Sequence, residues 1–164
     1  MDTSSAPETE ALAARLESAG AAMAAAMRQP ELARRLRAIP SEAEWSALQT
    51  LGHVVEMIPY WLAHCRALIA AAGEPPAFGR TLESPERLEG VERAETLGPD
   101  RLLIQLETEV RNAAQAIRGM TPDEMGKKGL HIRRGEMAVA DVLEVFIVKH
   151  AEDHLEQVRS ALET

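Results

Sequence analysis

Apolar residues recur along much of the chain every three or four positions, and this spacing predicts amphipathic helices rather than strands. The chain starts with a polar segment, residues 1–8, that is expected to be frayed. A first helix follows, with its apolar stripe at Leu12, Leu16, Ala19, Met23 and Met27. Pro30 interrupts this helix because proline lacks the backbone N–H that a helix interior uses. Residues 31–39 are expected to form a short extra helix.

A second long helix is predicted just ahead of Trp45. Ser41 is followed three residues later by Glu44, which is the pattern of a capping box at a helix start. This helix is expected to run to about residue 72, where a glycine and two prolines stop it. The connection that follows, residues 73–98, is far longer than most connections in compact domains. It is therefore either a long crossover between helices or a lid.

Two further helices complete the pattern. The third is expected to open at Gly98-Pro99 and end at Gly119, with its apolar stripe at Leu103, Leu106, Val110, Ala113 and Ile117. Thr121 and Glu124, with proline between them at the first helical position, form another capping box for a short helical turn. The last helix covers about residues 137–162. We find no alternating pattern typical of strands, so the sequence predicts an all-α fold of four main helices.

The second helix is apolar on two sides, which is more than one contact inside a bundle requires. One side is a seam formed by Leu48, Leu51, Val55, Ile58, Leu62, Cys65 and Ile69. His53 lies nearly opposite this seam. If the His53 side faces the core, the seam needs another partner, which is either a neighbouring helix or a second copy of the chain. A second copy would make a homodimer with helix two in its interface, and the seam alone leaves this possibility and cover by the first or third helix open.

Composition narrows the classes of function. The 164 residues are 46% hydrophobic and 27% charged, as expected for one globular domain spanning residues 9–164. The net charge of -8 argues against a nucleic-acid partner, which requires a basic face. No apolar run is long enough to cross a membrane, and the polar start does not resemble a signal peptide. With Cys65 as its only cysteine, the chain is expected to be cytoplasmic, and that thiol to be buried and inert.

Three histidines give the chain its clearest chemical signal. His150 and His154 are four residues apart, so they stack on one face of the last helix, and that face is apolar. His53 lies on the second helix. Imidazoles from two helices are a common way to build a metal site inside a bundle. The simpler alternative is that these histidines are ordinary packing residues. We favour metal, because unpaired imidazoles on an apolar stripe are costly.

The same residues carry a family resemblance. The chain resembles the DinB-like (YfiT-like) metal-binding superfamily in Trp45-Ser46 followed by His53, in Gly135-Glu136-Met137, and in the His150–His154 segment with Leu155-Glu156-Gln157-Val158 after it. The resemblance implies an up-down-down-up four-helix bundle, commonly a homodimer. It also implies a divalent metal held by residues matching His53, His150 and His154. One departure is Ala138, where relatives often have a helix-capping threonine.

Three protein ligands leave coordination positions open for water or a small-molecule substrate, as in catalytic sites. Such a site suits either thiol transfer or hydrolysis. The resemblance favours a metal-dependent enzyme that transfers a low-molecular-weight thiol, as some relatives do. The alternatives are a metal-dependent hydrolase and a non-catalytic metal-binding dimer associated with stress. Zinc, nickel and iron all accept imidazole, so the metal is not distinguished. Glu56, three residues after His53, could support the site but is expected to be solvated. His131 could approach the mouth of the site but is expected to be a plain loop residue, and His64 lies too far along the helix to bind the same ion.

Overall fold

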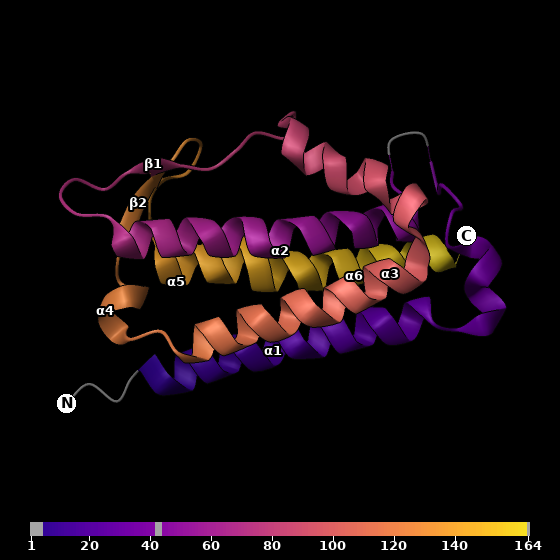
Figure 1. Cartoon of the computed structure of the whole chain (residues 1–164), viewed down its shortest axis with the longest axis horizontal. Coiled ribbons are helices and arrows are strands. Elements are labelled where there is room, and N and C mark those ends of the chain that lie inside the picture. The colour runs from indigo at the N-terminus through magenta and orange to yellow at the C-terminus, as the bar shows by residue number, and fades with distance from the viewer. Residues whose placement is uncertain (1–4, 42–43, 164) are drawn as a thin grey trace.

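Four long helical rods, arranged as a bundle, account for most of the structure (Figure 1). The computed structural model describes residues 5–41 and 44–163, so residues 1–4 of the polar start lie outside it. The rods are α1 (Ser5–Met27), α2 (Ala47–Ala70), α3 (Pro85–Arg118) and a final rod built from α5 (Val139–Val142), η2 (Leu143–Val148) and α6 (Lys149–Leu162). A short 3-10 helix, η1 (Pro30–Arg35), follows α1. The predicted all-α four-helix bundle is confirmed.

The order of packing explains the long connection in the middle of the chain. α2 packs against α3 and α6, and α1 packs against the same two helices. α2 and the second half of α3 run in the same direction, so the chain must return along the bundle between them (Figure 1). The topology is therefore up-down-down-up, with a crossover between the second and third rods.

The crossover contains more regular structure than the sequence pattern indicated. α3 begins at Pro85, not at Gly98-Pro99, and those two residues form a kink inside it, with Gly98 at a φ of 76°. The first half of α3 buries only a narrow stripe that includes Gly90, Val91 and Ala94. That stripe is too weak in apolar residues to stand out as a helical period in a charged segment.

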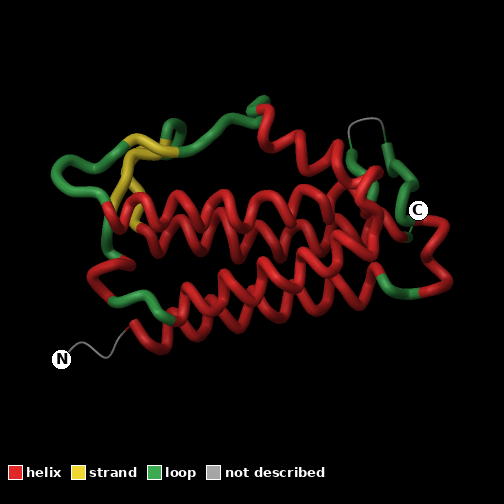
Figure 2. The backbone as a smooth tube through the Cα atoms, viewed as in Figure 1, coloured by secondary structure: helices red, strands yellow, loops and turns green. Residues whose placement is uncertain are grey.

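Three short strands also escaped the sequence analysis. β1 (Ala77–Phe78) pairs in parallel with β2 (Lys128–His131), which pairs antiparallel with β3 (Gly135–Ala138). The small sheet covers one end of the bundle (Figure 2). Strands of two to four residues are too short to show alternation. Residues 135–138 therefore belong to a strand, and the last rod begins at Val139.

The two predicted capping boxes had different outcomes. The box at Thr121 and Glu124 is confirmed at the start of α4 (Pro122–Met125). The Ser41 and Glu44 box is wrong, because those residues form only a turn and α2 is capped by Ser46. The Ser46 hydroxyl accepts the Gln49 N–H, and the Gln49 side chain accepts the Ser46 N–H. A glutamine at the third position makes the same reciprocal pair as a glutamate.

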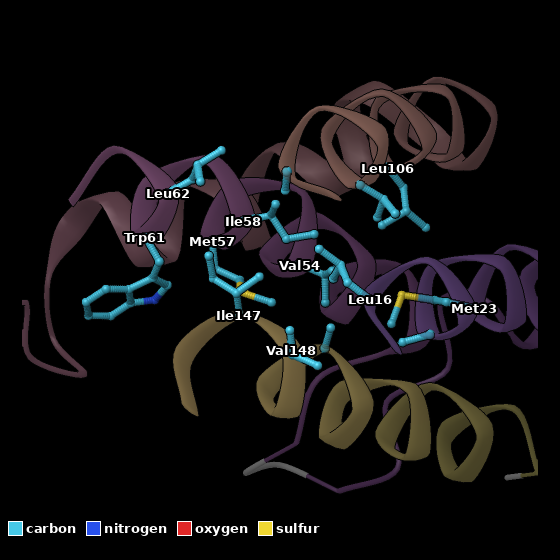
Figure 3. Close-up of a cluster of buried hydrophobic side chains, with 14 of the residues drawn as sticks. Leu16, Met23, Val54, Met57, Ile58, Trp61, Leu62, Leu106, Ile147 and Val148 are labelled. Carbon is cyan, nitrogen blue, oxygen red and sulfur yellow. The ribbon is translucent and has the colours of Figure 1, made fainter. Parts of the chain in front are cut away.

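The core joins all four rods, and it includes the apolar seam of α2 (Figure 3). Leu48, Leu51 and Ile58 are fully buried within a single chain. α3 packs along α2 and provides the cover that the seam requires. The geometric reason for placing helix two in a dimer interface was therefore wrong, since a neighbouring helix fills that role. No described helix is both long and apolar enough to cross a membrane.

Candidate metal centre

The three predicted imidazoles meet between α2 and α6. His53 comes from the second turn of α2, and His150 and His154 come from the first turns of α6. One nitrogen from each ring lies within 4.8 Å of the others. His53 is fully buried, His154 is 6% exposed, and His150 is half-buried at the edge of the group. Three ring nitrogens at this separation suit a single ion at their centre.

Hydrogen bonding within the described chain leaves ring nitrogens of His53 and His154 without a partner. Within the described chain, both ring nitrogens of His53 and the Nε2 of His154 are buried without a hydrogen-bond partner. The Nδ1 of His154 contacts the Gln157 side-chain oxygen, and His150 hydrogen-bonds to the Phe146 backbone. Unpaired buried nitrogens are costly, and a cation bound between them would remove that cost. The geometry and the donor set therefore fit a divalent metal.

All three imidazoles are held in the neutral form that binds metals. Burial lowers the pKa of His53 to about 2 and that of His150 to about 4, and it also lowers the pKa of His154. The positive charge of Arg87 adds to the lowering of all three pKa values. A neutral imidazole offers its lone pair without first losing a proton. The site is thus prepared for metal at neutral pH.

A π-helical segment, η2, immediately precedes the histidine pair. A π turn contains an extra residue, so it shifts the phase of the helix that follows, and such segments are frequent at functional sites. Within η2, the buried residues are Leu143, Ile147 and Val148. Phe146, which a regular helix would place on the same stripe as the histidines, is half-buried and stacks on Trp61 at 4.3 Å between ring centroids.

Glu56 is not the solvated carboxylate that the sequence suggested. Its side chain is 19% exposed, and Arg80 donates to it twice, with 2.8 Å between Nη2 and Oε2. The Arg80 side chain is only 6% exposed, and its guanidinium lies 3.8 Å above the Tyr60 ring. The Oε2 of Glu56 is 3.7 Å from the Nδ1 of His53. An arginine clamp thus holds a carboxylate beside one of the three imidazoles.

The remaining predicted residues lie outside the group of three. His131 is buried in β2, and its Nδ1 accepts the backbone N–H groups of Arg133 and Arg134, so the expectation of a plain loop residue was wrong. His64 is half-buried and lies against Tyr60. Cys65 is fully buried, and burial raises the pKa of its thiol to about 12. The prediction that the Cys65 thiol is buried is confirmed, and its lack of reactivity stays a prediction.

The first half of α3 is fixed against the centre by a contact between two glycines. A Cβ built on Gly52 would lie 2.3 Å from the Gly90 carbonyl oxygen, so the two backbones touch. Only glycine permits this approach. Gly52 precedes His53, and Arg87 is one turn before Gly90. The contact therefore sets Arg87 near the imidazoles.

A pocket of about 290 Å³ opens beside His154. Trp45, Arg87 and Gln157 contribute to its lining, together with the exposed Glu44. The Trp45 ring lies 5.1 Å from that of His53, and the Arg87 guanidinium lies 4.9 Å above the Trp45 ring. The pocket gives a small molecule a route to His154, the imidazole that lines it.

The comparisons with known proteins agree with the fold. The model of the DinB superfamily matches residues 15–158, which is most of the chain. The chain belongs to the DinB superfamily. Its structure is similar to that of YfiT from Bacillus subtilis, with a TM-score of 0.79, 15% identity, and coverage of 99% of this chain and 90% of that one. YfiT is described as a probable metal-dependent hydrolase with an unusual four-helix bundle topology. No protein of curated function matches the sequence.

In this DinB-superfamily protein, sequence reasoning found the three imidazoles but missed the residues around them. Arg80 and Arg87 lie in the crossover, which has no periodic pattern to connect it with the site. Trp45 precedes the cap of α2 and was part of the resemblance, but its position over His53 depends on the packing. Arginines within a charged segment give no signal of their own, so only the three-dimensional structure could place them.

Proposed function

We propose that His53, His150 and His154 bind one divalent metal ion and that the protein is a metal-dependent enzyme. The observation that carries this proposal is the convergence of three imidazoles with lowered pKa values, among which His53 and His154 have buried nitrogens without a hydrogen-bond partner in the described chain. Structural histidines are normally satisfied by hydrogen bonds. The adjoining pocket supports catalysis, since a purely structural ion needs no route to solvent.

Within this proposal, the reaction that we favour is transfer of a low-molecular-weight thiol to an electrophile. A bound divalent ion lowers the pKa of a coordinated thiol or water and so supplies a nucleophile near neutral pH. The thiol must come from a cosubstrate, because Cys65 is buried and its pKa is raised. Among the described residues, Glu56 is the only carboxylate within ion-pair distance of one of the three imidazoles. Arg80 already forms an ion pair with it. A thiolate nucleophile is favoured because it needs no further general base.

Hydrolysis is the second candidate, and the description of YfiT favours it. A hydrolytic reaction would need a proton acceptor for the attacking water. The exposed Glu44 at the rim of the pocket is available for that role. Hydrolysis and thiol transfer differ in their need for a cosubstrate, which makes them separable by experiment.

The proposed function predicts turnover that requires both metal and an external thiol. Metal-loaded protein is mixed with monobromobimane and a panel of small thiols, and thiol-dependent release of bromide is measured. Nitrophenyl acetate without thiol tests hydrolysis. We expect the thiol reaction to stop when EDTA removes the metal and to continue in Cys65→Ala, since that thiol is not used.

Each other outcome has a distinct meaning. Ester cleavage that needs metal but no thiol would replace transfer by hydrolysis. Turnover that is unchanged by EDTA would contradict the metal-dependent function. Metal binding without either reaction would leave a non-catalytic metal-binding protein.

Glu56 is expected to strengthen metal binding through His53. A carboxylate beside a ligand imidazole orients the ring and raises its basicity, and its loss commonly costs about 10- to 100-fold in metal affinity. We therefore predict this loss in Glu56→Gln, measured by competition with a chromophoric chelator. Glu107→Gln is the control, because that exposed carboxylate forms its ion pair with Arg28, away from the imidazoles. Equal affinities in the two variants would remove Glu56 from this role.

The homodimer and the cytoplasmic location remain predictions. The seam on α2, which first motivated the dimer, is covered by α3. The family resemblance alone therefore supports the homodimer.

A further inference from the structure

Arg87 lines the pocket and forms no ion pair with a described carboxylate. Its guanidinium donates to the Leu82 carbonyl oxygen at 3.1 Å, and it forms no ion pair with any described residue. Arg80, seven residues earlier, is neutralised by the two oxygens of Glu56. Two arginines thus approach the same centre from the crossover. Arg80 is held in an ion pair, whereas the acidic neighbours that act on Arg87, Glu56 and Glu83, form no ion pair with it.

The position of Arg87 is fixed rather than incidental. The backbone contact of Gly52 with Gly90 holds the first turns of α3 against α2. The Arg87 guanidinium lies on the Trp45 ring, whose centroid is 6.4 Å from that of His154. An arginine stacked on an aromatic ring keeps its planar edge available for a carboxylate or phosphate. A half-buried site strengthens such a contact relative to open water.

The charge around the pocket favours an anion. Neutral imidazoles leave the charge of a divalent ion uncompensated, and Arg87 adds another positive charge on the same side. Glu44 also lines the pocket, but it is exposed and forms no ion pair with Arg87. A volume of about 290 Å³ is at the small end of the usual range for ligand sites. The occupant is therefore small and acidic.

We propose that the pocket selects small carboxylic acids, with Arg87 binding the carboxylate while another group of the same molecule reaches the metal. This inference rests on the proposed metal-dependent function and adds the class of substrate to it. Arg87 would be a specificity-determining residue that contacts the substrate but not the metal.

The test measures binding, so that no reaction needs to be known. Metal-loaded protein is titrated calorimetrically with malonate, succinate and glutarate, and with the monocarboxylate that matches each in length. Wild type is expected to bind at least one dicarboxylate more tightly than its monocarboxylate. Arg87→Met is expected to lower the affinity for that dicarboxylate by about 10- to 100-fold, because a charged hydrogen-bonding partner is lost.

Arg93→Met is the matched control. Arg93 is exposed on the same helix, and its substitution removes the same charge. We expect this variant to stay within about twofold of wild type, because an exposed charge away from the pocket is screened. Circular dichroism and elemental analysis of each variant establish that fold and metal content are retained. Arg87→Lys keeps the charge without the planar fork and is expected to bind the dicarboxylate with an affinity between those of wild type and Arg87→Met.

Two results would overturn the proposal. One is a dicarboxylate preference that is equally large in wild type and in Arg87→Met. The other is wild-type protein that contains metal but binds none of the dicarboxylates at millimolar concentration. In both cases the metal-dependent function would stand. Wild-type protein that takes up no metal would instead refute the proposed function, so the two failures are distinguishable.

Discussion

Replacing His154 by alanine is expected to lower the affinity for a divalent metal by about two to three orders of magnitude. Binding of zinc to a four-ligand protein site is worth about 10–16 kcal/mol, so each ligand contributes roughly 2.5–4 kcal/mol. We expect the same loss in His53→Ala and His150→Ala, since their nitrogens converge on one point. Elemental analysis after gel filtration, followed by chelator competition, measures the effect.

His64→Ala is the matched control for these substitutions. His64 lies on the same helix as His53, is half-buried, and is not one of the three converging residues. Its replacement should leave one metal ion per chain. Metal content that survives all three ligand substitutions would refute the assignment, and a loss in His64→Ala would show that the assay reports unfolding instead.

The metal-free protein is expected to lose stability as the pH falls below about 6.5. In the unfolded chain a histidine gains its proton near this pH, whereas the folded pKa is about 2 for His53 and about 4 for His150. Between these values the unfolded state binds more protons, so acid favours unfolding. Between pH 8 and pH 5, each of the two imidazoles is expected to lower the free energy of unfolding by about 2 kcal/mol.

Urea denaturation of EDTA-treated protein at pH 8 and pH 5 measures this difference. His53→Leu is the control, because leucine fills a buried position without a titratable group. The free energy of unfolding of His53→Leu should fall less between pH 8 and pH 5 than that of wild type, and the difference should be about 2 kcal/mol, the contribution of His53. Wild type and His53→Leu with the same pH dependence would contradict a lowered pKa for His53. Saturating metal should protect wild type, since a bound ion stabilises the folded state by mass action.

Helical periodicity was sufficient to predict the bundle and the three imidazoles. Apolar spacing in α1, α2 and α6 is strong because each of these rods buries a full face in the core. The i, i+4 spacing of His150 and His154 then fixes their common face, whatever the rest of the chain does. These features are local, so a sequence can reveal them.

The surroundings of the centre depend on contacts between distant segments, and those were beyond sequence reasoning. The helix at residues 85–97 is polar and is held by a backbone contact with Gly52. The insertion in η2 changes which residues are buried before His150, and a regular helical wheel has no place for it. Glu56 acquires its arginine partner only because the crossover folds back over α2.

The crossover separates two tasks that many enzymes combine in the same segments. The imidazoles belong to α2 and α6, whereas Arg87, for which we propose a role in substrate selection, belongs to the stretch between α2 and the second half of α3. Under this proposal, substitutions around Arg87 change which molecule is recognised while the helices that carry the imidazoles keep their packing. We therefore expect DinB-superfamily proteins with different substrates to diverge most at positions equivalent to residues 81–88, whereas Arg80 is tied to His53 through Glu56. This short stretch is the natural place to begin redesigning specificity.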